Sequence, residues 1–167
     1  ARRFMPELFD SEFDQIKRLA GHLAANLVEH LAQDCSKAAD LDAVNERLGS
    51  FLDEYPFIQY VYLTDDKGKS VAARIIDPAY KDKYEAQPLG YDFSNREWFR
   101  LPMRTGKLHI TDVHQSQFTG QLIITVSTVV TNAREDVSGV IGADIQLEQI
   151  MRRAEALEEE AHQAEEE

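Results

Sequence analysis

The sequence predicts an α+β domain in which an antiparallel sheet of about five strands is combined with a long N-terminal helix and a C-terminal helix. Apolar residues recur at helical spacing before residue 36. Segments rich in β-branched and aromatic residues alternate with turns between residues 57 and 145, and charged residues with an apolar seam close the chain. Strands in hairpin order with helices gathered at the ends are typical of an α+β sheet.

The first part of the chain predicts two helices. Residues 5–35 form the first, because apolar side chains return at spacings of three, four and seven. The second is capped by Asp40 and ends near Pro56. The apolar stripe of the first helix consists of Phe9, Phe13, Ile16, Leu23, Leu27 and Leu31. The inward face of the second is expected to consist of Leu41, Val44, Leu48, Phe51 and Leu52.

The middle of the chain predicts the sheet. Residues 57–64 and 70–76 are expected to pair as a hairpin around a turn at residues 65–68. A long loop at residues 77–92 follows, and loops of this length tend to be functional. Ser94 and Glu97 have the spacing of a capping box, so a short helix should begin there, run to about Arg104 and stop at Gly106. The remaining strands are expected at residues 108–113, 121–131 and 137–145.

The last part of the chain predicts a charged helix with an apolar seam. The seam consists of Leu147, Ile150, Met151, Ala154, Leu157, Ala161 and Ala164. Two interpretations stay open: a solvated helix end, or a coiled-coil-like signalling helix that pairs with its copy in a dimer. The chain therefore divides into an N-terminal helix (1–36), a core (37–146) and a C-terminal helix (147–167).

The composition argues against several classes of function. A net charge of −12 argues against nucleic acid binding, which needs a basic face. The single cysteine, Cys35, excludes an internal disulfide and a cysteine-based zinc site. The sequence contains no Gly-x-Ser-x-Gly, P-loop or His-Glu-x-x-His motif. We therefore expect no enzymatic activity in this domain, no metal and no cofactor.

Several short motifs, in their order and spacing, resemble the Cache family of sensor domains. They are Tyr-Val-Tyr-Leu-Thr-Asp-Asp-Lys-Gly at residues 60–68, Arg-Glu-Trp-Phe at 96–99, Ile-Thr-Asp-Val at 110–113, Thr-Gly at 119–120 and Gly-Val-Ile-Gly-Ala-Asp-Ile at 139–145. Cache domains are PAS-like, PDC-type extracytoplasmic sensors of bacterial histidine kinases, chemoreceptors and diguanylate cyclases. The resemblance covers residues 5 to about 150 and fits a single module. It implies a PAS-like sheet and a ligand-binding sensor.

The resemblance also implies a binding site for a small anionic or zwitterionic molecule. The candidate ligand-binding residues are Tyr91, Arg96, Trp98, Phe99, His114, Ser116 and Asp144. Arginine offers two parallel donors to a carboxylate, and aromatic rings provide the flat apolar walls that small-molecule pockets require.

Three of these positions depart from the amino-acid-binding members of the family. Phe99 and His114 stand where those members have tyrosine, and Ser116 stands where they have the aspartate that faces the ammonium group of the ligand. The carboxylate half of the site is therefore better preserved than the amine half. We expect small organic carboxylates to be favoured over α-amino acids.

Alternatives stay open for individual residues. Arg96 can instead pair with Asp92 or Glu97, and Asp144 can cap the following helix. Trp98 and Phe99 can be plain core residues. At the level of function, the alternatives are a dimerisation module of the same fold that binds no ligand, and an enzyme or unrelated α+β domain.

Assembly and location are also expectations at this point. We expect a parallel homodimer through the 5–35 helix, whose apolar stripe is longer than one small domain can cover. No apolar run reaches the 18 residues of a membrane span, so we expect membrane contact only through segments outside this chain. The family resemblance implies an extracytoplasmic domain of an inner-membrane receptor. The charged C-terminal helix keeps a cytoplasmic sensor as the alternative.

Overall fold

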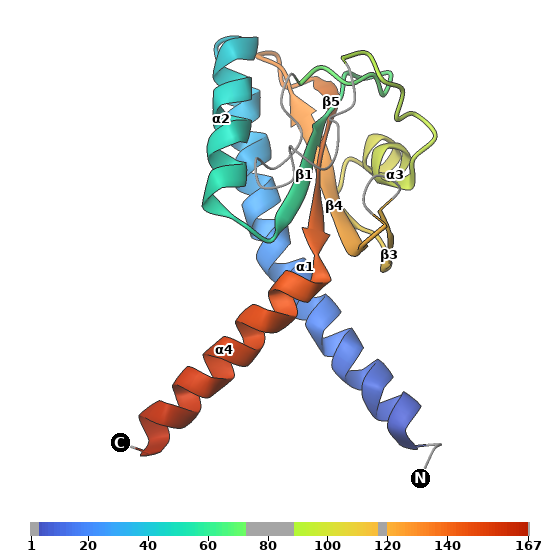
Figure 1. Cartoon of the computed structure of the whole chain (residues 1–167). Helices are drawn as coiled ribbons and strands as arrows, with labels where there is room; N and C mark the ends of the chain where they lie inside the picture. Colours follow the sequence, from blue (N-terminus) through green and yellow to red (C-terminus); the bar gives the residue numbers. More distant parts are fainter. Residues whose placement is uncertain (1–3, 73–88, 117–119, 167) are drawn as a thin grey trace.

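One antiparallel sheet, whose two longest strands come late in the chain, forms the centre of the fold (Figure 1). The computed structural model describes residues 4–72, 89–116 and 120–166. Within these residues the sheet has five strands in the order β1-β5-β4-β2, and β3 also pairs with β4. The strands are β1 (Ile58–Leu63), β2 (His109–Ile110), β3 (His114–Gln115), β4 (Leu122–Thr131) and β5 (Val137–Gln146). The predicted α+β fold with an antiparallel sheet of about five strands is confirmed.

Helices cover both faces of this sheet. Figure 1 shows α1 (Phe4–Lys37) and α2 (Leu41–Glu54) on one side and α3 (Glu97–Thr105) on the other. Successive side chains of a strand point to opposite faces. Every residue of β1 is buried, as expected for a strand that is covered on both faces.

The long helix α1 packs on β4 through small side chains, which let helix and sheet approach closely. The apolar residues buried on α1 are Ala20, Ala24, Val28, Leu31 and Ala32. Leu27 is partly buried and Leu23 is 45% exposed, so the predicted stripe turns from the sheet toward solvent along the helix. The side chains of residues 9, 13 and 16 lie outside the described set.

The second helix begins at its predicted cap. The backbone N–H of Ala43 donates to Asp40 Oδ1 at 2.8 Å. The predicted inward residues Val44, Leu48, Phe51 and Leu52 are buried. Leu41 is 49% exposed, which corrects the prediction for this residue. It occupies the first helical position, and side chains of a helix lean toward its N-terminus, so Leu41 points past the packed turns.

The predicted hairpin between residues 57–64 and 70–76 is confirmed at its turn, where Thr64 and Ser70 pair antiparallel, but the longer partner of β1 is another strand. β1 pairs with β5, from Ile58 opposite Ile145 to Leu63 opposite Ile141. Residues 70–72 form no strand and contact the end of β1 through a single bridge between Thr64 and Ser70. The Val71 N–H donates to the Leu63 carbonyl at 2.9 Å, so the chain lies beside the end of β1, while the Ser70 N–H donates on its other side to the carbonyl of residue 91 at 2.9 Å. Residues 73–76 lie outside the described set.

The helix α3 starts later than the predicted capping box. Its N-cap residue is Arg96, which makes no side-chain capping hydrogen bond. Ser94 instead belongs to a preceding turn, in which its N–H donates to Asp92 Oδ1 at 2.9 Å and the Arg96 N–H donates to the Phe93 carbonyl at 3.0 Å. The predicted end is confirmed, since Gly106 closes the helix with a left-handed φ of 69°.

The predicted strand at residues 108–113 is reduced to His109–Ile110. Thr111 interrupts the ladder, because its Oγ1 accepts the Thr125 N–H at 2.9 Å in place of a backbone carbonyl. The chain rejoins β4 at His114, opposite Ile123. The predicted strands at residues 121–131 and 137–145 are confirmed within one residue at each end.

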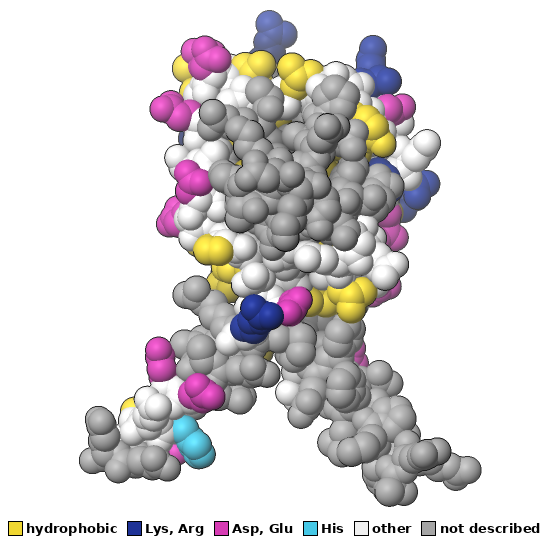
Figure 2. All heavy atoms as spheres, in the orientation of Figure 1, with side chains coloured by type: hydrophobic (Ala, Val, Ile, Leu, Met, Phe, Trp, Pro, Cys, Tyr) yellow, Lys and Arg dark blue, Asp and Glu magenta, His cyan; other side chains and the backbone are white. Residues whose placement is uncertain are grey.

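The helix α4 (Leu147–Glu166) continues directly from β5 and confirms the predicted C-terminal helix. Figure 1 shows α4 and the N-terminal part of α1 leaving the body at the same end of the molecule. Within the described ranges, no helix has the length and apolar character needed to cross a bilayer. Figure 2 shows acidic side chains along the edges of the body and on α4, in keeping with the net charge of −12.

Candidate functional site

The candidate site is built around the carboxyl group of Asp144 on the central strand β5. The register places Tyr60 of β1 and Thr125 of β4 opposite Asp144, whose side chain is buried. Tyr62 Oη donates a hydrogen bond to Asp144 Oδ2, and Thr125 Oγ1 donates to Oδ1 at 2.7 Å. Both carboxyl oxygens are therefore held by the neighbouring strands. The alternative that Asp144 caps α4 is wrong, because β5 continues to Gln146 before the helix begins.

Burial and neighbouring groups act in opposite directions on Asp144. Burial raises the pKa of this carboxyl, and it outweighs the hydrogen bonds from Tyr62 and Thr125 and the attraction of His114 and Arg96, which lower the pKa, so that the net value is about 6. Burial, and then the nearby carboxylate, raise the pKa of Tyr62 well above its usual range. The Tyr62 hydroxyl therefore keeps its proton and remains a donor to Asp144.

Trp98 forms an aromatic wall beside this carboxyl group. Its ring stacks on Tyr62 at a centroid distance of 5.0 Å and lies 5.2 Å from the ring of Phe93. The Trp98 carbonyl accepts a hydrogen bond from Ser127 Oγ at 2.7 Å. Gly142 lies beneath the ring, where an added Cβ would stand 3.3 Å from Trp98 Cε3. The first turn of α3 is thus fixed against β4 and β5.

Arg96 and His114 bring a guanidinium group and an imidazole ring to the same region. Arg96 stands at the N-cap of α3. The two acidic residues near it in the sequence, Asp92 and Glu97, pair with other residues. Asp92 lies 3.7 Å from Lys69 Nζ. Glu97 lies 3.2 Å from a ring nitrogen of His109. The Nδ1 atom of His114 is 2.9 Å from the carbonyl of residue 112, to which it can donate.

These side chains enclose a very small cavity. It is lined by Tyr62, Arg96, Trp98, His114, Ser116, Ile123, Thr125 and Asp144. Its volume of about 10 Å³ gives room for roughly one water molecule. An organic ligand of several heavy atoms does not fit this closed arrangement. Ligand entry therefore requires α3, or the chain around His114 and Ser116, to move away from the sheet.

The structure brings most of the predicted site residues together. Arg96, Trp98, His114, Ser116 and Asp144 line the cavity, whereas Tyr91 and Phe99 do not. Tyr91 is half-buried, with its ring 4.8 Å from that of Phe93, one aromatic layer away from the cavity. Phe99 is 7% exposed and belongs to the hydrophobic core, the reading that the sequence left open for it.

Sequence reasoning missed three residues that line the cavity. Tyr62 was assigned to the hairpin, and Ile123 and Thr125 only to a strand. Tyr62 shares a face of β1 with Tyr60, whose register partner is Asp144, so alternation along the strand is a signal for its position. That signal is usable only when the pairing of β1 with β5 is known.

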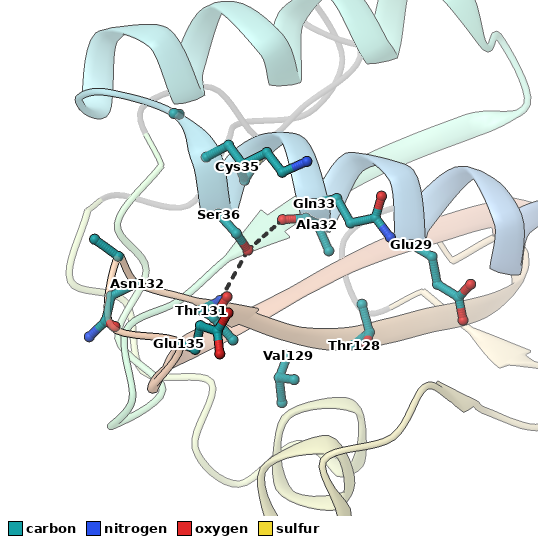
Figure 3. Close-up of a pocket in the computed structure, with 13 residues that line it drawn as sticks. Glu29, Ala32, Gln33, Cys35, Ser36, Thr128, Val129, Thr131, Asn132 and Glu135 are labelled. Carbon is teal, nitrogen blue, oxygen red and sulfur yellow. Dashed lines mark hydrogen bonds between the residues drawn. The ribbon is translucent and has the colours of Figure 1, made fainter.

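A larger hollow lies elsewhere, between the C-terminal turns of α1 and the turn that joins β4 to β5 (Figure 3). Its volume is about 930 Å³, and its lining includes Glu29, Cys35, Thr128 and Glu135. Ser36 Oγ links α1 to the end of β4, because it donates to the Ala32 carbonyl at 2.7 Å and accepts the Thr131 N–H at 3.1 Å. Burial raises the pKa of the Cys35 thiol to about 11, which makes this thiol unreactive. The charged residues of this open groove, Glu29, Lys37 and Glu135, are exposed, unlike the buried Asp144.

Comparison with known proteins decides the family. Residues 44–152 match the family described as methyl-accepting chemotaxis protein-like, first PDC sensor domain. The chain belongs to this PDC sensor-domain family. The recognised Cache resemblance and the role as a sensor domain are thereby confirmed.

Two curated relatives illustrate the extent of the likeness. The PDC domain is 36% identical over 159 residues to citrate (Re)-synthase of Syntrophus aciditrophicus, covering 95% of this chain and 25% of that protein. It is 28% identical over 117 residues to the methyl-accepting chemotaxis protein TlpB of Bacillus subtilis, covering 70% of this chain and 17% of that protein. The chain thus spans a quarter or less of the length of these curated relatives.

A solved structure shows the same fold. The ligand-binding domain of the Pseudomonas fluorescens chemoreceptor CtaA, in complex with L-alanine, matches the PDC domain with a TM-score of 0.62 and 24% identity. The match covers 90% of this chain and 61% of that one.

Proposed function

We propose that this PDC domain binds a small organic carboxylate or amino acid between Arg96 and Asp144 and relays the binding event to an output domain. The observation that carries the proposal is the convergence of Arg96, His114 and Asp144 beside Trp98 at one cavity. A guanidinium group, an imidazole ring and a carboxyl group at one small aromatic-walled site suit a ligand that carries a carboxylate and a second polar group.

The carboxylate of the ligand is assigned to Arg96. A guanidinium group can donate two parallel hydrogen bonds to a carboxylate, and Trp98 beside it offers an apolar face for the rest of the ligand. CtaA, which shares the fold, is described as bound to L-alanine. Ser116 provides no charge for an amine, so we expect small carboxylates to bind more tightly than the corresponding α-amino acids where Asp144 is protonated, that is below a pH of about 6.

The second candidate function is a dimerisation module of the same fold that binds no ligand. The cavity volume of about 10 Å³ favours this alternative, because the site is closed as it stands. The charged lining favours the first proposal. A site that served only for packing would gain more from apolar side chains than from a buried carboxyl and an arginine.

A thermal-shift screen separates the two functions. Amino acids and their deaminated analogues are tested as matched pairs, and a compound that binds only the native state raises the melting temperature. We expect at least one small carboxylate to raise the melting temperature. At a concentration one hundred times its Kd, such a ligand adds about 2.7 kcal/mol to the free energy of unfolding. A flat response to all compounds, at concentrations up to tens of millimolar, would support the closed module.

The full-length receptor is also part of the proposal. We infer that residues 1–36 pair protomers, residues 37–146 hold the ligand and residues 147–167 transmit the signal to a histidine kinase, chemoreceptor or diguanylate cyclase output domain. The family favours an extracytoplasmic location, with a cytoplasmic sensor as the alternative. The synthase activity in the name of one relative belongs to that protein, and we propose no enzymatic activity for this domain.

We expect the domain to form a weak parallel dimer through α1. Leu19 is 64% exposed and Leu23 45% exposed, and their spacing of four places both on one side of the helix. The variants Leu19→Glu and Leu23→Glu should dissociate the dimer in analytical ultracentrifugation at high micromolar concentration. Leu122→Glu, at a leucine of β4 that is 51% exposed, is the matched control and should leave the dimer intact. A strictly monomeric wild type, or equal dissociation by the control, would contradict this interface.

A further inference from the structure

Two hydroxyl groups beneath the candidate site hold Asp144 in a fixed orientation. Tyr62 Oη on β1 donates to one carboxyl oxygen, and Thr125 Oγ1 on β4 donates to the other at 2.7 Å. Tyr62 is 3% exposed and Thr125 is 1% exposed. Both donors are neutral, and each favours the ionised form of the carboxyl, because a hydroxyl that donates to a carboxylate stabilises the negative charge.

Among the residues that the structure describes, Asp144 is the only acidic side chain that lines the cavity. The groups that face it are Tyr62 from β1, Thr125 from β4, Arg96 from the start of α3 and His114 from β3. Ser116, also in the lining, adds no charge. The net charge that a ligand meets in this site therefore changes by one when Asp144 gains or loses a proton.

We propose that Tyr62 and Thr125 are positioning residues that set the charge of Asp144, and that they thereby determine whether the site favours a ligand group that is cationic or one that is neutral or anionic. This inference rests on the proposed function. With Asp144 ionised, the site offers an acceptor to an ammonium group. With Asp144 protonated, it offers a donor, and the remaining charge of Arg96 favours a plain carboxylate.

The proposal assigns opposite pH dependence to the two ligand classes. An amine-bearing ligand binds the ionised form, so its affinity should rise as the pH rises through the titration of Asp144. A plain carboxylate binds the protonated form, so its affinity should rise as the pH falls through the same range. Each apparent affinity scales with the fraction of the competent form.

Removing either hydroxyl should shift this balance toward the protonated form. The variants Tyr62→Phe and Thr125→Val keep the ring and the side-chain shape, respectively, and lose the donor. We expect each to raise the titration midpoint of Asp144 from about 6 by roughly one unit, a tenfold change in proton affinity. At pH 6 the affinity for an amine-bearing ligand should then fall roughly five-fold and that for a plain carboxylate should rise roughly two-fold.

The test is a carbon-13 NMR titration of the aspartate carboxyl carbons in the ligand-free chain. Asp144→Asn identifies the carboxyl resonance of Asp144 by its loss. Thr125→Ser restores the donor and should return the midpoint to that of the wild type. A wild-type midpoint near the usual value of about 4, or an unchanged midpoint in both Tyr62→Phe and Thr125→Val, would overturn the proposal.

A binding measurement keeps this inference distinct from the proposed function. L-alanine and propionate form a matched probe pair, measured by calorimetry between pH 5 and pH 8. Their affinities should respond to pH with opposite signs, and a parallel response would overturn the selection by charge. If neither probe nor any screened compound binds, the proposed function falls, while the NMR titration still decides whether the two hydroxyls set the charge of Asp144.

Discussion

Replacement of Arg96 by alanine is expected to weaken ligand binding by about 2 kcal/mol or more, which corresponds to a roughly thirty-fold rise in Kd. Arg96 lines the cavity opposite Asp144 and caps α3 without a side-chain capping hydrogen bond. Its loss therefore removes a charge-assisted contact to the ligand without removing a helix cap. Isothermal titration calorimetry with the best compound from the screen measures the effect.

Two further variants make the result specific. Arg100→Ala removes the same charge from an exposed position on α3 and should leave Kd unchanged. Arg96→Lys keeps the charge and loses the planar pair of donors, so it should recover only part of the affinity. Equal Kd values for Arg96→Ala and the wild type would remove Arg96 from the site, and an equal loss in Arg100→Ala would show that only net charge matters.

Replacement of Gly139 by alanine is expected to cause a large loss of stability. Gly139 stands on β5 where the end of β1 crosses closely, and an added Cβ would lie 1.8 Å from the Thr64 carbonyl oxygen. The obstacle is backbone, so relief requires the strands to separate. We expect a loss of about 3 kcal/mol or more, seen as a fall of roughly 6–12 °C in the melting temperature.

Gly21→Ala is the matched control for this change. An added Cβ there would meet the end of the flexible Ile110 side chain at 3.2 Å, which can turn aside. Alanine also suits the interior of α1 better than glycine. Gly21→Ala should therefore be neutral or stabilising in the same melting experiment. A melting temperature for Gly139→Ala within 2 °C of the wild type would show that β1 and β5 approach less closely than described.

The sequence predicted the features that depend on local chemistry. The cap at Asp40, the end of α3 at Gly106 and the limits of β4 and β5 follow from turn residues and short-range patterns. The grouping of Arg96 and Trp98 was also accessible, because both stand within one turn of α3.

Features that depend on long-range pairing were not predictable from local patterns. β1 pairs along its length with β5, more than 75 residues later in the sequence, and only at its end with the segment that follows it. The role of Tyr62 depends on that pairing, which brings its hydroxyl to Asp144. The break after Ile110 depends on Thr111, whose side chain replaces a backbone acceptor. An apolar strand pattern does not reveal that a side-chain oxygen accepts this hydrogen bond in place of a backbone carbonyl.

The most direct test of the ligand-binding proposal is a crystal structure of the domain with the tightest compound from the screen. We expect an opened cavity in which the ligand carboxylate lies within hydrogen-bond distance of the Arg96 guanidinium group, with the apolar part of the ligand against Trp98 and its second polar group at Asp144. A ligand seated in the groove at the C-terminal end of α1, or anywhere away from Arg96 and Asp144, would contradict it.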